Sequence, residues 1–384
     1  MKNKRILILC KVVDNYGDVG VVFRLAKALS EQDKTLELTI VCSDLESFSL
    51  LTKNHFSIDT QKKSQRCIFN DSVWTILDWT QEENFRYEPS PFPTILECFQ
   101  CGRPEWLESI LFSKTANKTF HIFNIEYLTA EAYAEEFHLL KSYTRSSNVK
   151  KMFFMPGFTN KTGGLIIDKT FMNSLKKSEL QKKDDKIFTV AIFSYERSFD
   201  EVFVALQNFA QKVREKEKDF CVKVFAAAGK SQPFVKKSWE KFGKDIILQE
   251  LDFLPQEEWD ELLCTCDFNF VRGEESLARA SLCAKPFVWH AYIQEENYQL
   301  VKVNSLLEKI LPFIKDEAAG IALKQVWQDY NTPNKSLSAN ALQLLFEAAY
   351  NKNLTKDFKE FSASLFTNGN LAENLLSYMS KIGL

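Results

Sequence analysis

The 384-residue sequence lacks several features that would place it in other classes of protein. No uninterrupted apolar stretch approaches the ~18 residues of a membrane-spanning helix, so we expect no membrane segment. The 49 Lys and Arg residues against 51 Asp and Glu give a net charge of −2, which argues against nucleic-acid binding. The apolar start lacks a small-residue cleavage site, so we interpret it as a first strand rather than a secretory signal. With nine cysteines and no such signal, we expect reduced thiols and a cytoplasmic protein.

Two closely spaced cysteine pairs are the main candidates for a metal site. They are Cys98 with Cys101 and Cys264 with Cys266. A zinc site would require the pairs to converge, or histidine partners at suitable spacing. Cys98 lies in an apolar run and Cys264 in a predicted amphipathic helix, so we interpret both pairs as core cysteines and expect no metal.

The segment AAAGKS, which ends in Gly229, Lys230 and Ser231, imitates the end of a phosphate-binding P-loop. That motif requires a glycine five positions before Gly229, where this sequence has Val224. A P-loop is therefore excluded.

The chain is organised around DNYGDVG at residues 14–20, which follows the apolar run 6–13 and precedes a helical pattern at 21–29. We expect a strand, a tight glycine-bearing loop and a helix, as at the start of a Rossmann-like unit. Asp14 and Asp18 would repel a phosphate, but they suit a loop that accepts a proton or holds a cation. Helix capping by one of them is the alternative, although two acids flanking Tyr-Gly are harder to explain by capping alone.

Strand and helix patterns alternate through both halves of the chain, which indicates parallel sheets with helices on both faces. The alternation stops at 156–164, a segment rich in turn residues, and we place the domain junction between about 160 and 186. We therefore predict an α/β protein with Rossmann-like domains at 1–170 and 186–360. Helices follow at the C-terminal end, and the one at about 365–384 is predicted to pack back on the first domain.

In the second half, a predicted strand runs into RGEES at residues 272–276. The amides of a helix start together with Arg272 could hold a diphosphate. In the alternative interpretation, Glu274 and Glu275 simply complement the helix dipole, and the spacing leaves both interpretations open.

Other residues of the second half follow predicted strands at the same carboxyl edge, where ligands bind in open α/β sheets. For each residue alone, loop packing is the alternative, and a lone histidine is more often structural than catalytic. These residues are Phe193, Tyr195, Phe253, Gln256, His290 and Tyr292.

Six motifs occur in an order that resembles one family across almost the whole chain. They are DNYGDVG at 14–20, FNIEYL at 123–128, PGFTNKTGGL at 156–165, FSYE at 193–196, RGEES at 272–276 and KPFVWH at 285–290. Together they resemble the protein-arginine rhamnosyltransferases of bacterial elongation factor P. The sequence departs from that pattern at Ala291–Gln294, where the family has a Tyr-Pro-Gln ending, and at Glu275, where the family has Asp.

The resemblance implies a GT-B glycosyltransferase, in which two Rossmann-like domains face each other across a cleft. It implies inverting transfer of L-rhamnose from dTDP-β-L-rhamnose to one arginine of elongation factor P, without a metal or other cofactor. This modification would activate the factor for relief of ribosome stalling at polyproline.

Carried over by position, Asp18 would be the general base, Asp14 would orient the acceptor guanidinium, and Glu274 would be a second catalytic carboxylate. The implied donor site consists of Asn15, Tyr16, Gly17, Asp18, Phe193, Tyr195, Phe253, Gln256, Arg272, Gly273, Glu274, Glu275 and Ser276. The alternatives are another GT-B transferase, a sugar-nucleotide epimerase, or a non-catalytic nucleotide- or protein-binding module. The paired acids argue against the last.

Overall fold

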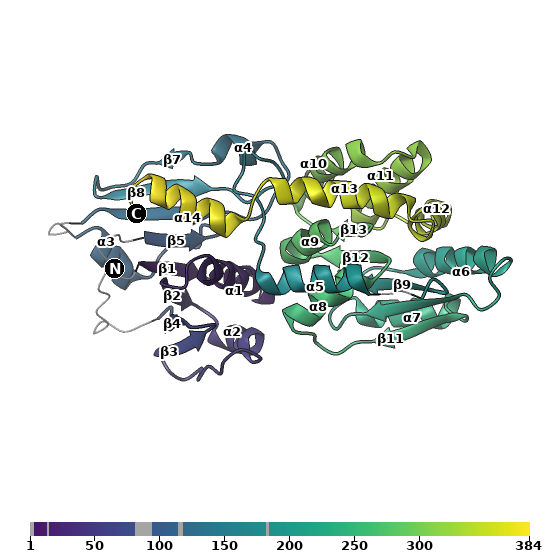
Figure 1. The fold of residues 1–384 in the computed structure, drawn as a ribbon, viewed down its shortest axis with the longest axis horizontal. Helices are drawn as coiled ribbons and strands as arrows, with labels where there is room; N and C mark the ends of the chain where they lie inside the picture. The colour runs from purple at the N-terminus through teal and green to yellow at the C-terminus, as the bar shows by residue number, and fades with distance from the viewer. Residues whose placement is uncertain (1–3, 14, 81–93, 114–117, 182–183) are drawn as a thin grey trace. The chain divides into compact units, whose positions relative to one another are not determined.

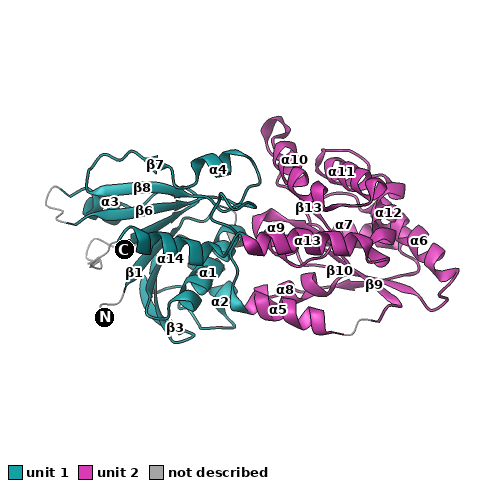
Figure 2. Ribbon diagram, turned by 45° about the horizontal axis from the view of Figure 1, so that its top comes forward, with its two compact units in different colours: residues 1–169, 368–384 teal, residues 170–367 magenta. Residues whose placement is uncertain are grey.

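The computed structural model describes residues 4–13, 15–80, 94–113, 118–181 and 184–384 (Figure 1). The chain forms two compact units (Figure 2). Unit 1 comprises Met1–Lys169 and Asn368–Leu384, and unit 2 comprises Thr170–Thr367. Unit 2 is therefore an insertion in the chain of unit 1, which the chain leaves after Lys169 and enters again at Asn368.

Unit 1 contains, within the described residues, an eight-stranded sheet with the order β3-β4-β2-β1-β5-β6-β8-β7. Its strands are β1 (Arg5–Cys10), β2 (Glu37–Cys42), β3 (Ser64–Phe69), β4 (Ser72–Asp78), β5 (Thr94–Cys98), β6 (Phe120–Ile125), β7 (Lys141–Ser142) and β8 (Val149–Phe154). The six inner strands are parallel, whereas β3 and β7 pair antiparallel at the two edges. Strands buried on both faces read as continuous apolar runs, and β5 is buried along its whole length.

Helices cover both faces of this sheet. Successive side chains of a strand point to opposite faces, so an apolar strand supplies side chains to a core on each face. Ile6 and Ile8 of β1 pack in one core with α1 (Asn15–Gln32) and α14 (Leu371–Lys381), while Leu7 and Leu9 pack in a second core with α3 (Glu105–Leu111). The helices of unit 1 are α1 (Asn15–Gln32), α2 (Leu45–Thr52), α3 (Glu105–Leu111), α4 (Tyr133–Phe137) and α14 (Leu371–Lys381).

Helix α14 returns the end of the chain to unit 1, where it packs beside α1 (Figure 2). The side chain of Asn370, just before α14, donates to Ile167 O at 2.6 Å and accepts from Ile167 N at 3.3 Å. The Leu371 amide donates to Leu165 O at 2.8 Å. The two segments that connect the units are therefore hydrogen-bonded side by side within unit 1.

Unit 2 contains, in the part of the chain that is described, a five-stranded parallel sheet with the order β11-β10-β9-β12-β13. Its strands are β9 (Ile187–Ile192), β10 (Cys221–Ala226), β11 (Ile246–Glu250), β12 (Phe268–Arg272) and β13 (Phe287–His290). Numbered within the unit this order is 3-2-1-4-5, as in the Rossmann fold. The predicted α/β fold with two Rossmann-like parts is confirmed.

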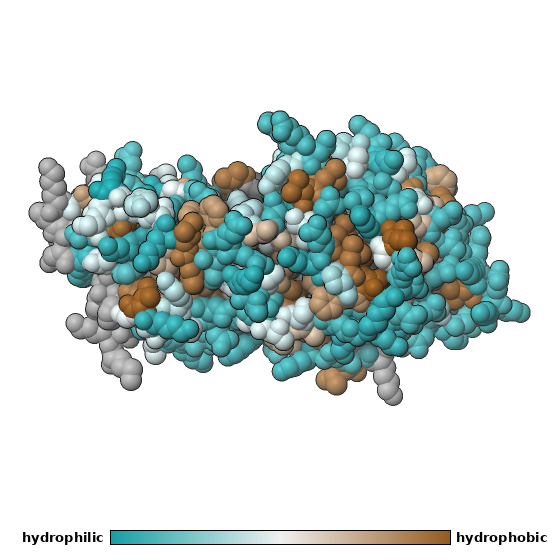
Figure 3. Space-filling model, turned by 90° about the horizontal axis from the view of Figure 1, so that it is seen from above, coloured by the Kyte–Doolittle hydropathy of each residue, from teal (hydrophilic) through white to brown (hydrophobic). Residues whose placement is uncertain are grey.

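The helices of unit 2 cover both faces of its sheet, and the part of the unit that follows β13 is helical (Figure 1). They are α5 (Lys169–Leu180), α6 (Asp200–Arg214), α7 (Gln232–Phe242), α8 (Gln256–Thr265), α9 (Gly273–Leu282), α10 (Gln299–Ile310), α11 (Glu317–Asn331), α12 (Ala339–Tyr350) and α13 (Asn353–Thr367), with short 3₁₀ turns at Glu295–Asn297 and Leu311–Phe313. Among the described helices, none has both the length and the apolar character needed to cross a membrane. On the face in Figure 3, hydrophilic side chains cover most of the surface and apolar ones form separate small groups.

Candidate functional site

In unit 1 the candidate site lies where the strand order reverses. Strand β1 has β2 on one side and β5 on the other, so the loops after β1 and β5 diverge at this point. Open α/β sheets bind their ligands at such a switch point, at the carboxyl ends of the strands. The loop after β1 leads into α1, which carries Asp18 in its first turn.

Asp18 is almost fully buried, with 2% of its surface exposed. Its Oδ2 accepts a hydrogen bond from the Val13 amide at 2.8 Å, and its Oδ1 accepts one from the Tyr127 hydroxyl at 3.0 Å. A buried carboxylate requires such donors to offset the loss of water. The two donors come from the segments that follow β1 and β6, at the carboxyl edge of the sheet.

The helix of this segment begins earlier than the sequence predicted. A tight glycine-bearing loop was expected over 14–20, but the chain is helical from Asn15, so Gly17, Asp18 and Gly20 belong to α1. The prediction of a loop is therefore wrong for these residues. Asn15 and Tyr16 begin the helix, whereas Asp14 lies outside the described residues.

The segment after β6 contacts the turn after β5 through the two consecutive residues Glu126 and Tyr127. The ring of Tyr127 stacks on Phe99 with ring centres 4.3 Å apart and an angle of 14° between planes. Gln100 donates to Glu126 Oε1 at 2.6 Å, and Asn124 donates to the same oxygen. Burial raises the pKa of Glu126, although both of these hydrogen bonds act in the opposite direction. The motif FNIEYL at 123–128 indicated a functional segment, but it did not indicate that Tyr127 would contact Asp18.

In unit 2 the corresponding switch point lies between β9 and β12. The guanidinium carbon of Arg272, at the end of β12, lies 4.6 Å from the ring centre of Phe193 and 4.7 Å from that of Tyr195. Both aromatic residues follow β9. The structure thus brings Arg272 into a cation–π arrangement with two predicted aromatic residues that lie about 80 positions earlier in the sequence.

The loop that imitated a P-loop also borders this group. Gly229 has φ +134°, and a Cβ added to it would lie 3.7 Å from Phe193 and 4.0 Å from Arg272 Nη2. The segment therefore contributes backbone beside the arginine, without the glycine pattern of a phosphate-wrapping loop.

Arg272 is the residue directly before helix α9, and Gly273, the first residue of that helix, has φ +68°. Glu274 and Glu275 are half-buried in that turn. Glu275 lies 3.5 Å from Nε of the buried Arg279, and the Ser276 hydroxyl accepts a hydrogen bond from Trp259 Nε1 at 3.2 Å. Trp259 also packs edge-to-face on Phe193, a link that its sequence position did not reveal.

The two other predicted residues follow β11 at the same edge. Phe253 is 42% exposed, and Gln256 is the first residue of α8. Both therefore lie after the carboxyl end of a strand, as predicted.

His290 has a structural position. It is buried, and burial together with the charges of Arg197 and Arg272 lowers its pKa to about 3. Its Nδ1 lies 2.8 Å from the Ser194 hydroxyl and accepts from the Tyr195 amide at 3.4 Å. The neutral imidazole thus anchors the loop that carries Tyr195. Tyr292, which is 66% exposed, packs its ring 5.7 Å from that of Tyr195.

The cysteine pairs lie in the protein interior: Cys98, Cys264 and Cys266 are buried, and Cys101 is half-buried. Burial raises the pKa of the Cys98 and Cys101 thiols, so both remain protonated near neutral pH. Among the described residues, no three His, Cys, Asp or Glu side chains are grouped as metal ligands.

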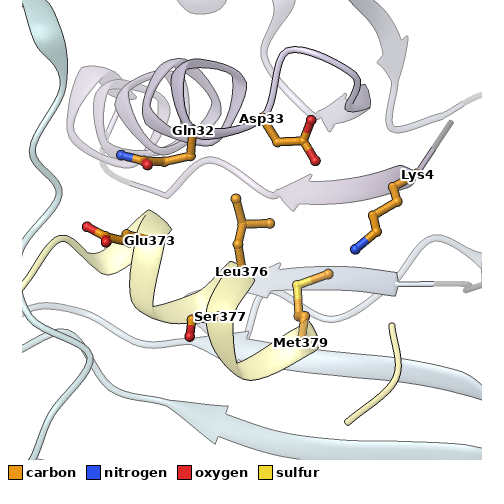
Figure 4. Close-up of a pocket in the computed structure, with 7 residues that line it drawn as sticks. All are labelled: Lys4, Gln32, Asp33, Glu373, Leu376, Ser377 and Met379. Carbon is orange, nitrogen blue, oxygen red and sulfur yellow. The ribbon is translucent and has the colours of Figure 1, made fainter. Parts of the chain in front are cut away.

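A cavity of about 330 Å³ opens between α1 and α14, and the predicted site residues do not line it (Figure 4). Gln32 and Asp33 border it at the opposite end of α1 from Asp18. The lining residues are Lys4, Gln32, Asp33, Glu373, Leu376, Ser377 and Met379.

Comparisons with known proteins are consistent along the chain. Residues 6–380 match the family model described as elongation factor P (EF-P) rhamnosyltransferase EarP. A protein-arginine rhamnosyltransferase of Shewanella oneidensis is 31% identical over 386 residues, covering 89% of this chain and 93% of the relative. One from Neisseria meningitidis serogroup B is 25% identical over 402 residues, covering 97% of this chain and 96% of the relative.

Solved structures show the same fold. A structure describing EarP-mediated arginine glycosylation of translation elongation factor EF-P has a TM-score of 0.59 and 17% identity, with 99% of each chain covered. A UGT transferase from Siraitia grosvenorii in complex with UDP has a TM-score of 0.53 and 9% identity, with 98% of this chain and 99% of that chain covered. The predicted GT-B class is confirmed by these neighbours.

Proposed function

The chain belongs to the family of elongation factor P rhamnosyltransferases, and from this premise we propose how its two units perform rhamnosyl transfer. The chain is an arginine glycosyltransferase that modifies elongation factor P. We propose dTDP-β-L-rhamnose as its donor, unit 2 as the donor-binding unit and unit 1 as the source of the general base.

The observation that carries the donor assignment is the position of Arg272 at the switch point of unit 2, against Phe193 and Tyr195. A guanidinium can bind two phosphate oxygens at once, and the start of α9 adds amide donors and partial positive charge. These groups would stabilise the charge that develops on the departing diphosphate, so the reaction would need no metal ion. The nucleoside would lie along Phe193, Tyr195, Phe253 and Gln256.

The acceptor chemistry requires a base that is held in place. The arginine side chain has a pKa above ~12 and a delocalised charge, so it is a poor nucleophile in water. In the proposed step, a guanidinium nitrogen forms a bond to C1 of rhamnose and loses one proton to Asp18. The C1–O bond breaks at the same time, and its electron pair leaves with dTDP. Attack opposite the leaving group inverts the configuration at C1.

Asp14 and Glu274 are assigned supporting roles in this reaction. We propose that Asp14 orients the acceptor guanidinium and that Glu274, in the first turn of α9, is a second carboxylate at the reacting centre. Gly17 and the start of α1, with Gly273, Glu275 and Ser276, would complete the donor site. The modified factor would act at ribosomes stalled on polyproline, which places the reaction in the cytoplasm.

Mass spectrometry of elongation factor P tests this proposal directly. The purified factor is incubated with the enzyme and dTDP-β-L-rhamnose, and parallel reactions omit the enzyme or replace the donor with dTDP-glucose. We expect the mass of one deoxyhexose on a single arginine in the complete reaction only. No gain with dTDP-rhamnose would contradict the donor assignment. Turnover of the donor without the factor would instead indicate a sugar-nucleotide epimerase.

A further inference from the structure

Tyr127 makes a contact to which the proposed function gives no role. Its hydroxyl donates to Oδ1 of Asp18 at 3.0 Å, while the Val13 amide donates to Oδ2 of the same carboxylate at 2.8 Å. Asp18 is 2% exposed, whereas Tyr127 is 39% exposed. The tyrosine therefore joins the buried carboxylate to the surface of unit 1.

The position of Tyr127 is itself fixed by its neighbours. Its ring stacks on Phe99, whose amide donates to Ile125 O at 2.7 Å. Phe99 and Gln100 have φ values of +60° and +50°, a left-handed conformation that non-glycine residues adopt rarely and that recurs at functional sites. The strained turn after β5 thus provides the ring on which Tyr127 rests.

The two hydrogen bonds to Asp18 restrict its orientation. Both carboxylate oxygens lie off the Cβ–Cγ bond, so rotation about that bond would break the hydrogen bond at each oxygen, and two bonds oppose this rotation more strongly than one. A base fixed in this way can receive a proton in a defined direction, and positioning of this kind has a large effect on rate.

We propose that Tyr127 is a positioning residue for rhamnosyl transfer and that its hydroxyl fixes the carboxylate of Asp18 toward the acceptor guanidinium. This inference rests on the proposed role of Asp18 as the base and extends it to a residue 109 positions away. The phenol acts through Asp18, and the Phe99 ring acts through the phenol.

Tyr127→Phe tests the inference, because it removes the hydroxyl and retains the ring on Phe99. We expect kcat to fall roughly 10-fold to 100-fold, with KM for elongation factor P, the affinity for dTDP and the melting temperature unchanged. Tyr350→Phe is the matched control, since Tyr350 also donates to a carboxylate, Glu217 Oε1, at 2.9 Å, but does so in unit 2. Its kcat should equal that of the unmodified enzyme.

Other outcomes would overturn the inference. An unchanged kcat in Tyr127→Phe would exclude a role for the hydroxyl. A rise in KM for elongation factor P at constant kcat would show that Tyr127 contacts the acceptor protein instead. A lowered melting temperature of Tyr127→Phe, together with an equal loss of kcat in Tyr350→Phe, would show a general structural effect. Asp18→Asn is measured in parallel. If that variant keeps full activity, the assignment of the base fails; if it is inactive while Tyr127→Phe is fully active, only the present inference fails.

Discussion

Nη1 of Arg24 donates to Oδ2 of Asp168 at 2.9 Å, and both side chains are almost completely buried. Arg24 lies in α1, the helix that carries Asp18, and Asp168 directly precedes the segment where the chain leaves unit 1. The ion pair thus connects the helix of the candidate base to the first crossing. A buried charge is stable only with its partner in place.

Removal of one member of this pair is expected to destabilise unit 1 strongly. Asp168→Ala deprives the buried Arg24 charge of this carboxylate. We expect the free energy of unfolding, measured in urea, to fall by about 3–5 kcal/mol. The control is Asp219→Ala, because the Lys186–Asp219 pair is exposed and should contribute less than about 1 kcal/mol. Equal effects of the two variants would contradict a special role for the buried pair.

Asp18→Asn is expected to abolish transfer without weakening donor binding. The amide retains the shape of the side chain but cannot take up the proton, so we expect kcat to fall by at least roughly 100-fold. Affinity for dTDP, measured by titration calorimetry, should stay the same. Asp33→Asn, just beyond the other end of α1, serves as the control and should transfer rhamnose normally.

Arg272→Ala is expected to weaken dTDP binding. A hydrogen bond to a charged group contributes about 1.5–3 kcal/mol, so we expect the dissociation constant to rise roughly 10-fold to 100-fold. The matched control is Arg145→Ala in unit 1, where the guanidinium carbon likewise lies over an aromatic ring, 3.9 Å from the centre of Phe112. Calorimetry that finds the same affinity for both variants would move the diphosphate away from Arg272.

The buried His290 is expected to make stability depend on pH. Its pKa is about 3 in the folded protein and about 6.5 in an unfolded chain, so the unfolded state binds the extra proton first. Stability is therefore fully present above pH 6.5 and falls as the pH decreases toward 3, by up to about 1.4 kcal/mol per pH unit. His138 in unit 1, with a pKa lowered by burial to about 4, acts in the same direction.

Replacement of the histidine separates its contribution from that of the carboxylates. In His290→Asn, the free energy of unfolding between pH 7 and pH 5 should decrease less steeply than in the unmodified protein, whatever the absolute stability of the variant. Urea titrations at several pH values measure this slope. An unchanged slope would mean that His290 does not become protonated on unfolding in this range.

The sequence predicted which residues follow the strands better than it predicted which of these residues contact each other. The apolar runs at β1 and β9 were recognisable because buried parallel strands contain few polar residues. Residues after those strands could therefore be placed at the carboxyl edge of the sheet, where Arg272 lies with Phe193 and Tyr195. That this edge binds a ligand stays a prediction. The meeting of Tyr127 with Asp18 depends on strand order, which one sequence does not determine.

Two local structures differ from the sequence analysis for physical reasons. Residues 15–20 are helical although they contain two glycines, because Val19 and the following apolar residues of α1 pack into the core and tertiary packing outweighs propensity. The junction proposed over 160–186 contains the helix α5. This helix is packed into the protein, since Phe171 is fully buried and the guanidinium carbon of Arg279 lies 4.7 Å from its ring centre.

The return of α14 to unit 1 sets an order for folding during synthesis. The ribosome makes residues 1–169, then all of unit 2, and only then the helix that supplies Leu371, Leu375 and Met379 to the core beside β1. Unit 2 can therefore fold while unit 1 still exposes the apolar surface that α14 covers. Exposed apolar surface of this kind favours aggregation, so we expect unit 1 to be most prone to aggregate during this interval. A circular permutant whose chain starts at unit 2 would make α14 before residues 1–169 and so remove the delay.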